Sequence, residues 1–192
     1  MACDLKDIGI QSTSCEPVIP GTGSKAYIFD VDTAFPTVVP VPKEGTNEYD
    51  WNELIGKGED QTDPGIDGNL YAIKIKPRSG HPTGTREENK KVANTIIEAV
   101  VDEDLDNFHA IEAVLPYKNI GLIVSDNAGK FYVYMSPYQQ PTYSANFEGG
   151  QNISSDIGTT FTLSYVSRFL ACKVTPETAG VNLDQYLASK KS

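Results

Sequence analysis

The chain has 192 residues, a length that suits one domain with a real hydrophobic core. Hydrophobic residues make up 39% and charged residues 22%, which is typical of a folded globular protein and excludes a disordered tail. The formal net charge is −10, which argues against tight, sequence-independent binding of nucleic acid, because such binding needs clustered Lys and Arg. No stretch approaches the roughly 20 apolar residues of a membrane-spanning helix, and the polar N-terminus predicts no secretory signal.

The first third of the chain predicts strands separated by long connections. Residues 1–24 lack periodicity and predict an irregular arm, whereas residues 25–32 alternate as a strand does. Residues 35–41 are extended, but their prolines confine them to a sheet edge or a loop. A second strand is predicted over residues 70–76.

A long acidic, Gly-rich loop is predicted over residues 43–68. It contains an apolar cluster that includes the single tryptophan of the chain: Tyr49, Trp51, Leu54 and Ile55. Loops of this length in compact domains are usually functional or disordered. We therefore expect the loop to be loose in the free chain and this cluster to become ordered against a partner.

The middle of the chain predicts a polar loop, a strand and a helix. After the loop at residues 77–89, the β-branched run at residues 92–101 indicates a strand. Its core-facing residues would be Thr95, Ile97, Ala99 and Val101, and its opposite face would carry Asn94, Glu98 and Asp102. A helix is predicted over residues 103–114, capped by Asp102 and stopped before Pro116.

The last third predicts a β-hairpin and a closing strand. Residues 120–125 and 131–135 alternate on either side of the turn Asp126-Asn127-Ala128-Gly129. Residues 160–165 alternate in the same way, and a Gly- and Ser-rich connection separates them from the hairpin. The predicted fold is mainly β: an antiparallel β-sandwich or half-barrel with one packed α-helix, as a single domain over residues 1–192. Residues 175–192 form a C-terminal tail in this interpretation.

No reactive constellation is found, so the chain is predicted not to be an enzyme, with no catalytic, cofactor-binding or metal-binding residues. His81 suits an exposed loop and His109 suits packing beside the helix. The acidic run at 102–106 lacks the glycine and the glutamate of a calcium loop. Asp60, Asp63, Asp67 and Asn69 fit a solvated loop better than a calcium site. Gly21-Thr22-Gly23-Ser24-Lys25 leads into a strand where a phosphate-binding loop would lead into a helix.

The cysteines and the aromatic residues are better explained by packing than by catalysis or ligand binding. The chain has three cysteines, Cys3, Cys15 and Cys172, which lie far apart in the sequence and predict reduced thiols; a disulfide between Cys3 and Cys15 is the alternative left open. Five aromatic side chains cluster around the hairpin and the connection after it: Tyr132, Tyr134, Tyr138, Tyr143 and Phe147. They could stack on bases or sugars, but the region is poor in Lys and Arg, so core and subunit-interface packing is the favoured interpretation.

Two segments carry a family resemblance. The hairpin VSDNAGKFYV at residues 124–133 and the segment SSDIGTTFTLSY at residues 154–165 resemble tail tube proteins (major tail proteins) of phages and prophages, particularly those of Bacteroidetes hosts. The start MACDL also resembles that group. The likeness is strongest over the last third and fades through residues 43–92. It departs from the usual pattern at Met135-Ser136-Pro137-Tyr138, where a Gly-containing segment is common.

The resemblance implies a virion structural protein without cofactors. Such subunits form hexameric rings that stack into a tube, contact other tail proteins and conduct DNA without binding it specifically. The resemblance also implies assembly in the bacterial host cytoplasm and a final place in the virion tail. In this interpretation Asn94, Glu98 and Asp102 are lumen candidates, and Tyr49, Trp51, Leu54 and Ile55 make inter-ring contacts. The alternative is a carbohydrate-binding or adhesin-type β-sandwich, in which exposed Tyr side chains and Trp51 stack on sugars.

Overall fold

Two packed β-sheets form the body of the protein. The computed structural model describes residues 22–43, 46–55, 65–66, 70–77, 79–80, 82–86, 93–101, 109, 112–113, 115–126, 130–136, 139–148, 158–169 and 172–175. Within them the chain is mainly β, with two short α-helices, α1 (Val31–Ala34) and α2 (Trp51–Ile55). The predicted fold class, a mainly β sandwich, is confirmed.

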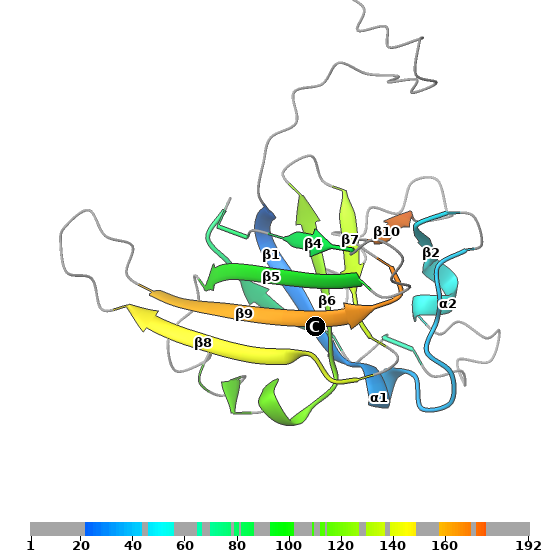
Figure 1. Ribbon diagram of the computed structural model, residues 1–192, viewed down its shortest axis with the longest axis horizontal. Coiled ribbons are helices and arrows are strands. Elements are labelled where there is room, and N and C mark those ends of the chain that lie inside the picture. Colours follow the sequence, from blue (N-terminus) through cyan, green and yellow to red (C-terminus); the bar gives the residue numbers. More distant parts are fainter. Residues whose placement is uncertain are drawn as a thin grey trace, which may run out of the picture.

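The larger sheet has six strands and the smaller has four. The order in the six-stranded sheet is β2 (Glu48–Asp50), β10 (Cys172–Thr175), β7 (Phe131–Tyr134), β6 (Ile120–Asp126), β1 (Thr22–Asp30) and β3 (Tyr71–Lys74). The order in the four-stranded sheet is β4 (Thr83–Thr85), β5 (Ala93–Val101), β9 (Gly158–Ser167) and β8 (Thr142–Glu148). Figure 1 shows β5, β9 and β8 running across the strands of the six-stranded sheet behind them.

The hairpin of β6 and β7 is confirmed at the position that the sequence predicts. Ser125 pairs with Phe131, and the Asp126 backbone N–H donates to the Lys130 carbonyl oxygen at 2.8 Å. The Asp126 carboxylate also accepts from the Lys130 backbone N–H at 2.8 Å. A carboxylate that accepts a backbone N–H within a turn is the reason why Asp is favoured there.

One hydrophobic core lies between the two sheets. Ile28, Leu122 and Tyr134 from the six-stranded sheet belong to the same buried cluster as Phe161 and Tyr165 from the four-stranded sheet. At one corner a bridge between Ile75 and Val101 joins the chain just after β3 to the end of β5. The alternation predicted for residues 160–165 is confirmed, because every second residue of β9 is buried.

A second core covers the opposite face of the six-stranded sheet. Trp51, Leu54 and Ile66 cluster there with Phe29 and Ile123. As a result the first five residues of β6 are all buried, on both faces of the sheet. The six-stranded sheet is therefore covered on both faces within the described part of the chain.

The loop predicted over residues 43–68 is partly regular structure. It contains β2, which pairs in parallel with β10, and α2, which follows β2 directly. Ile66 donates its backbone N–H to the Leu54 carbonyl oxygen at 2.9 Å, which fastens the chain after α2 back onto that helix. Residues 56–64 lie outside the described part of the chain.

Several predicted boundaries differ from the structure. The first strand ends at Asp30, because the Asp30 carboxylate caps α1 by accepting from the Asp32 backbone N–H at 3.1 Å. Residues 35–41 form no strand, so the loop is the alternative that the structure shows of the two, sheet edge or loop, that the sequence left open. Four of the strands that the structure describes were not predicted: β2 within the loop at 43–68, β4 within the loop at 77–89, β8 within the Gly- and Ser-rich connection, and β10 after β9.

The predicted helix at residues 103–114 lies mostly outside the described residues. Within it, Ala113 donates its backbone N–H to the His109 carbonyl oxygen at 3.0 Å, the i to i+4 bond of a helical turn. The 3₁₀ turn η2 (Leu115–Tyr117) follows. The described residues include only the end of the predicted arm, residues 22–24 in β1, and the first residue of the predicted C-terminal tail, residue 175 in β10. The rest of both segments lies outside the described residues, as do Cys3 and Cys15. None of the described helices is both long and apolar enough to span a membrane.

Candidate functional site

Strand β5 divides its side chains between the core and the surface as the sequence predicts. Ile97, Ala99 and Val101 are buried, whereas Glu98 is exposed on the opposite face. The pairing of Asn94 with Val166 places residue 94 on this outward face as well, although its side chain is not described. Asp102 lies outside the described residues. Of the three lumen candidates, Glu98 is therefore the one whose side chain the structure locates on the open face.

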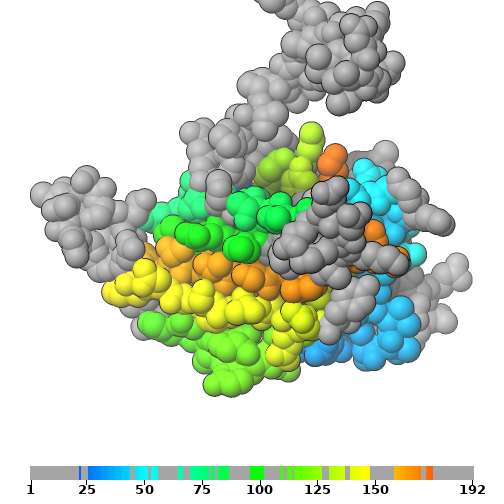
Figure 2. Space-filling model, in the orientation of Figure 1, coloured from blue at the N-terminus to red at the C-terminus, as the bar shows by residue number. Residues whose placement is uncertain are grey.

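Hydroxyl and amide side chains dominate this outward face of the four-stranded sheet. Glu98 pairs with Thr162, and Thr162 pairs with Ser144, so these three residues form one row across β5, β9 and β8. A parallel row holds Val100, Thr160 and Asn146, and another holds Ile96, Ser164 and Thr142. Figure 2 shows the three strands side by side on this face of the molecule. We call it the hydroxyl face.

Charge is sparse on the hydroxyl face. Among the outward side chains that the structure describes within these four strands, Glu98 is the one with a formal charge. Arg86 and Arg168 lie just beyond the ends of β4 and β9, where the Arg86 guanidinium donates to the Arg168 carbonyl oxygen at 2.6 Å. A surface of this kind stays hydrated but offers no cluster of cations to phosphate groups.

Strand β8 is an open sheet edge within the described part of the chain. It pairs with β9 on one side, and the sheet order ends there. Its sequence, TYSANFE, contains no lysine or proline, which are the residues that commonly block edge pairing.

The end of β8 also leaves apolar side chains uncovered. Tyr143, Ala145 and Phe147 share the core-facing side, because they pair with Leu163, Phe161 and Thr159. Near the start of the strand Tyr143 is partly buried and lies close to Glu112; burial and the Glu112 carboxylate together raise the pKa of Tyr143. Further along, Ala145 is exposed and Phe147 is 57% exposed. The edge therefore offers unpaired backbone and uncovered apolar surface together.

The four inter-ring candidates do not lie at the surface. Tyr49 and Trp51 are 6% and 4% exposed, and Leu54 and Ile55 are buried even more completely. All four belong to the core on the outer side of the six-stranded sheet. The prediction that they wait for a neighbouring ring is wrong for these side chains, because they complete the core of their own chain.

The aromatic residues do not form a stacking platform among the described residues. Trp51 and Tyr134 are buried, and Tyr132 is half-buried with its hydroxyl donating to the Asp126 carboxylate at 3.4 Å. The exposed aromatic side chains are spread over different elements: Tyr71 on β3, Tyr117 on η2 and Phe147 on β8. Tyr138 lies outside the described residues.

The titratable candidates also lack a constellation. His109 is exposed, which corrects the packing role predicted for it, and its Nδ1 lies 3.1 Å from a Glu112 carboxylate oxygen. No group of three or more His, Cys, Asp or Glu side chains that could hold a metal occurs within the ranges given above. His81, Asp60, Asp63, Asp67 and Asn69 fall outside those ranges. Cys172 is a buried thiol whose pKa is raised by burial to about 11.

The residues that sequence reasoning missed are those of β8. Thr142, Ser144 and Asn146 alternate with Tyr143, Ala145 and Phe147, a period-two pattern that could have predicted the strand. No family model matches this chain, and neither a curated protein nor a solved structure matches it.

Proposed function

We propose that the protein is a structural subunit that assembles side by side into rings, and that the rings stack into the tail tube of a phage, prophage or tail-like particle. The open edge at β8, with its uncovered Phe147, is the observation that carries the proposal. An unblocked edge of this kind is a hazard for a monomer and is removed when another chain pairs with it. The subunit would be made in the bacterial cytoplasm and would end in the virion tail.

The two edges of the four-stranded sheet support a ring rather than a dimer. β8 lies at one edge and β4, an exposed three-residue strand, lies at the other. Pairing of β8 in one copy with β4 in the next uses two different surfaces, and such head-to-tail contacts close into rings when the rotation allows it. Six copies, the number implied by the family resemblance, would join their four-stranded sheets into one continuous wall.

The hydroxyl face suits the inside of that wall. Its Thr, Ser and Asn side chains accept and donate hydrogen bonds to water, and Glu98 would repeat once per subunit as a ring of carboxylates. DNA would pass such a wall without binding, since the described face lacks clustered cations. The role is passive and requires no cofactor.

The carbohydrate-binding alternative has less support. Trp51, its strongest sugar-stacking candidate, is buried in the core. The exposed Tyr71 and Tyr117 lie on separate elements, β3 and η2, so strand pairing does not bring them together as a platform for a sugar ring.

Negative-stain electron microscopy and sedimentation velocity of the full chain test the proposal. Wild-type protein is expected to form rings or tubes as its concentration rises. Phe147→Lys should abolish them, because a lysine on the edge opposes strand addition. Val38→Lys is the matched control: Val38 is 75% exposed but lies outside both sheets, so this variant should assemble like wild type.

Two results would refute the proposal. A wild-type chain that stays monomeric at millimolar concentration, without rings in the micrographs, is incompatible with a tube subunit. Assembly of Phe147→Lys that matches wild type would show that the β8 edge is not the contact. Circular dichroism of both variants checks that each retains the fold.

A further inference from the structure

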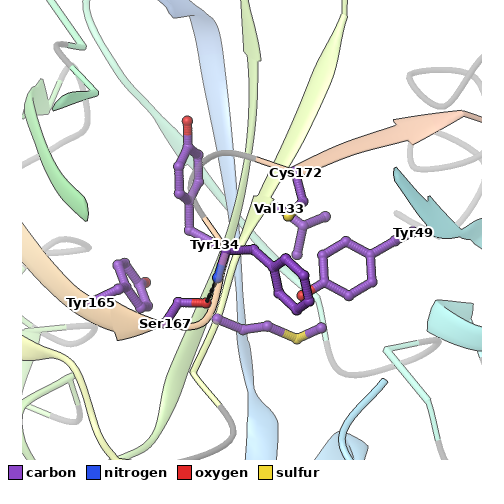
Figure 3. Close-up of a pocket in the computed structure, with 8 residues that line it drawn as sticks. Tyr49, Val133, Tyr134, Tyr165, Ser167 and Cys172 are labelled. Atoms are coloured by element: carbon purple, nitrogen blue, oxygen red, sulfur yellow. Dashed lines mark hydrogen bonds between the residues drawn. The ribbon is translucent and has the colours of Figure 1, made fainter. Parts of the chain in front are cut away.

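The two ends of the four-stranded sheet differ in how their core-facing side is covered. Where β9 ends, Tyr134 and Tyr165 are 5% and 1% exposed, and Figure 3 shows them with Tyr49 around the crossover to β10. At the other end, where β8 finishes, Ala145 is exposed and Phe147 is 57% exposed. We call Ala145 and Phe147 the β8 apolar end.

Edge pairing between copies does not cover the β8 apolar end. Gly84 is the core-facing residue of β4, because it pairs with Thr95, which in turn pairs with the buried Tyr165. Glycine has no side chain, so a neighbouring copy that adds its β4 to β8 brings backbone to the edge but no apolar side chain to Phe147. Another segment of the neighbouring copy is needed to cover this surface.

The start of β1 lies close to β4. The Gly80 backbone N–H donates to Thr22 Oγ1 at 3.1 Å, and both residues are buried. Gly80 precedes Thr83, the first residue of β4, by three positions, which span at most about 10 Å. Residues 1–21 therefore join the fold beside the edge that the proposed ring sets against β8 of another copy.

The residues just before β1 are apolar. Residues 17–20 read Pro-Val-Ile-Pro, and we call them the arm segment. Ile19 precedes Thr22 by three positions and can therefore reach about 10 Å from the start of β1. Paired strands are only about 4.8 Å apart, so this reach is enough to pass from β4 of one copy to β8 of its neighbour. Proline lacks the N–H that a strand ladder uses, so the arm segment suits packing on a face better than strand addition.

The β8 strand of a neighbouring copy is a nearer target for the arm segment than β8 of its own chain. Within one chain β5 and β9 separate β4 from β8, which makes the distance three strand spacings, or about 14 Å. The space beneath β5 and β9 is also filled, because Ile97 and Phe161 are buried there. Across the proposed ring contact β4 and β8 are direct neighbours.

We propose that the arm segment of each subunit packs on the β8 apolar end of the neighbouring subunit. The contact rests on the proposed function, because it requires that β4 of one copy pairs with β8 of another. The interface then has two parts, which are backbone pairing along the edge and apolar packing beneath it. Val18 and Ile19 supply the apolar side chains that Gly84 lacks.

Disulfide formation between two substituted forms of the full chain tests this contact. Both proteins carry Cys3→Ser and Cys15→Ser; one also carries Ile19→Cys and the other Ala145→Cys. They are mixed at a concentration at which the wild-type chain forms rings, and are oxidised with glutathione disulfide. The expected product is a mixed dimer of about twice the 20.9 kDa chain mass, which reduction returns to monomer. Mass spectrometry of the linked peptides identifies the two positions.

The matched control replaces the Ala145→Cys protein by a Val38→Cys protein in the same background. Val38 is 75% exposed but lies outside both sheets, so it should form no mixed dimer with the Ile19→Cys protein. Each protein oxidised alone shows which disulfides form between like positions.

Electron micrographs of the same samples separate the arm contact from the tube function. Rings without the mixed dimer would overturn the arm contact and leave the tube function standing. A mixed dimer without rings would support the arm contact and count against the tube, and the absence of both would refute both. An internal disulfide in a dilute chain that carries both Ile19→Cys and Ala145→Cys would also overturn the proposal, because the arm segment would then cover β8 of its own chain.

Discussion

Replacement of Leu54 by Ala separates the two roles that the α2 segment could have. Leu54 is fully buried in the core that α2 forms with the six-stranded sheet. The substitution removes about three methylene equivalents at ~0.8 kcal/mol each, or ~2.4 kcal/mol of transfer free energy. A cavity term adds to this, so the loss in the free energy of unfolding should be about 3 kcal/mol, within the ~2–5 kcal/mol range for such changes.

Urea unfolding of the dilute chain, followed by the fluorescence of Trp51, measures this loss. Trp51 is the single tryptophan and lies in the same helix, so it reports on the region that is changed. With a slope of about 2 kcal/mol per molar urea, the midpoint should fall by roughly 1.5 M. Val38→Ala, at an exposed position, should shift the midpoint little. A Leu54→Ala midpoint equal to that of wild type would refute the reasoning and return α2 to the role of a contact surface.

Two further changes test the packing of the six-stranded sheet and one of its surface ion pairs. At Gly121 an added Cβ would lie 2.2 Å from the Phe29 ring. Gly121→Ala should therefore lower the free energy of unfolding by about 1–3 kcal/mol in the same urea assay, and an unchanged urea midpoint would contradict this prediction. Burial is the largest single influence on Asp30 and raises its pKa, but the hydrogen bonds from Lys118, at 2.9 Å, and Thr33, together with the Lys118 charge, outweigh it and lower the pKa below 3.8. The stability that the Asp30–Lys118 pair contributes should be present above pH 3.8 and should be lost as the pH falls through the lower pKa that Asp30 has in the folded chain. Lys118→Met should therefore show a smaller fall in Tm on acidification than wild type. Identical Tm–pH profiles for the two proteins would count against a contribution of the pair to stability.

Local periodicity was enough to predict the strands that carry large β-branched or aromatic side chains. β5, β7 and β9 alternate, β6 is a nearly continuous apolar run, and the residue types of the turn at Asp126 indicate the hairpin between β6 and β7. The strand β8 has the same period, but its outward residues are small and polar and its neighbours are Gly and Ser. The difference in hydrophobicity between its two faces is therefore small, and its sequence resembles that of a loop.

The layer formed by β2 and α2 could not be predicted for a different reason. β2 has three residues and pairs in parallel with β10, near the other end of the described chain. Such a pairing depends on the tertiary fold and leaves no local pattern. The apolar cluster around Trp51 was expected to become ordered against a partner, whereas it is buried in the core of its own chain. Sequence alone does not distinguish such a core from an interface with another chain.

The sparse charge of the hydroxyl face changes how a tube built from this chain would work. A net charge of −10 suggests a wall that repels DNA, yet the described outward side chains of the four-stranded sheet contribute one carboxylate, Glu98. At physiological salt, potentials from exposed charges fall off within about 8 Å, so the Glu98 carboxylate of each subunit acts over a narrow band of the wall. Elsewhere the described part of the face would prevent binding because it lacks cations and its hydroxyl groups hold water. Passage of DNA through such a tube would then depend more on the scarcity of Lys and Arg on the described face than on repulsion by carboxylates.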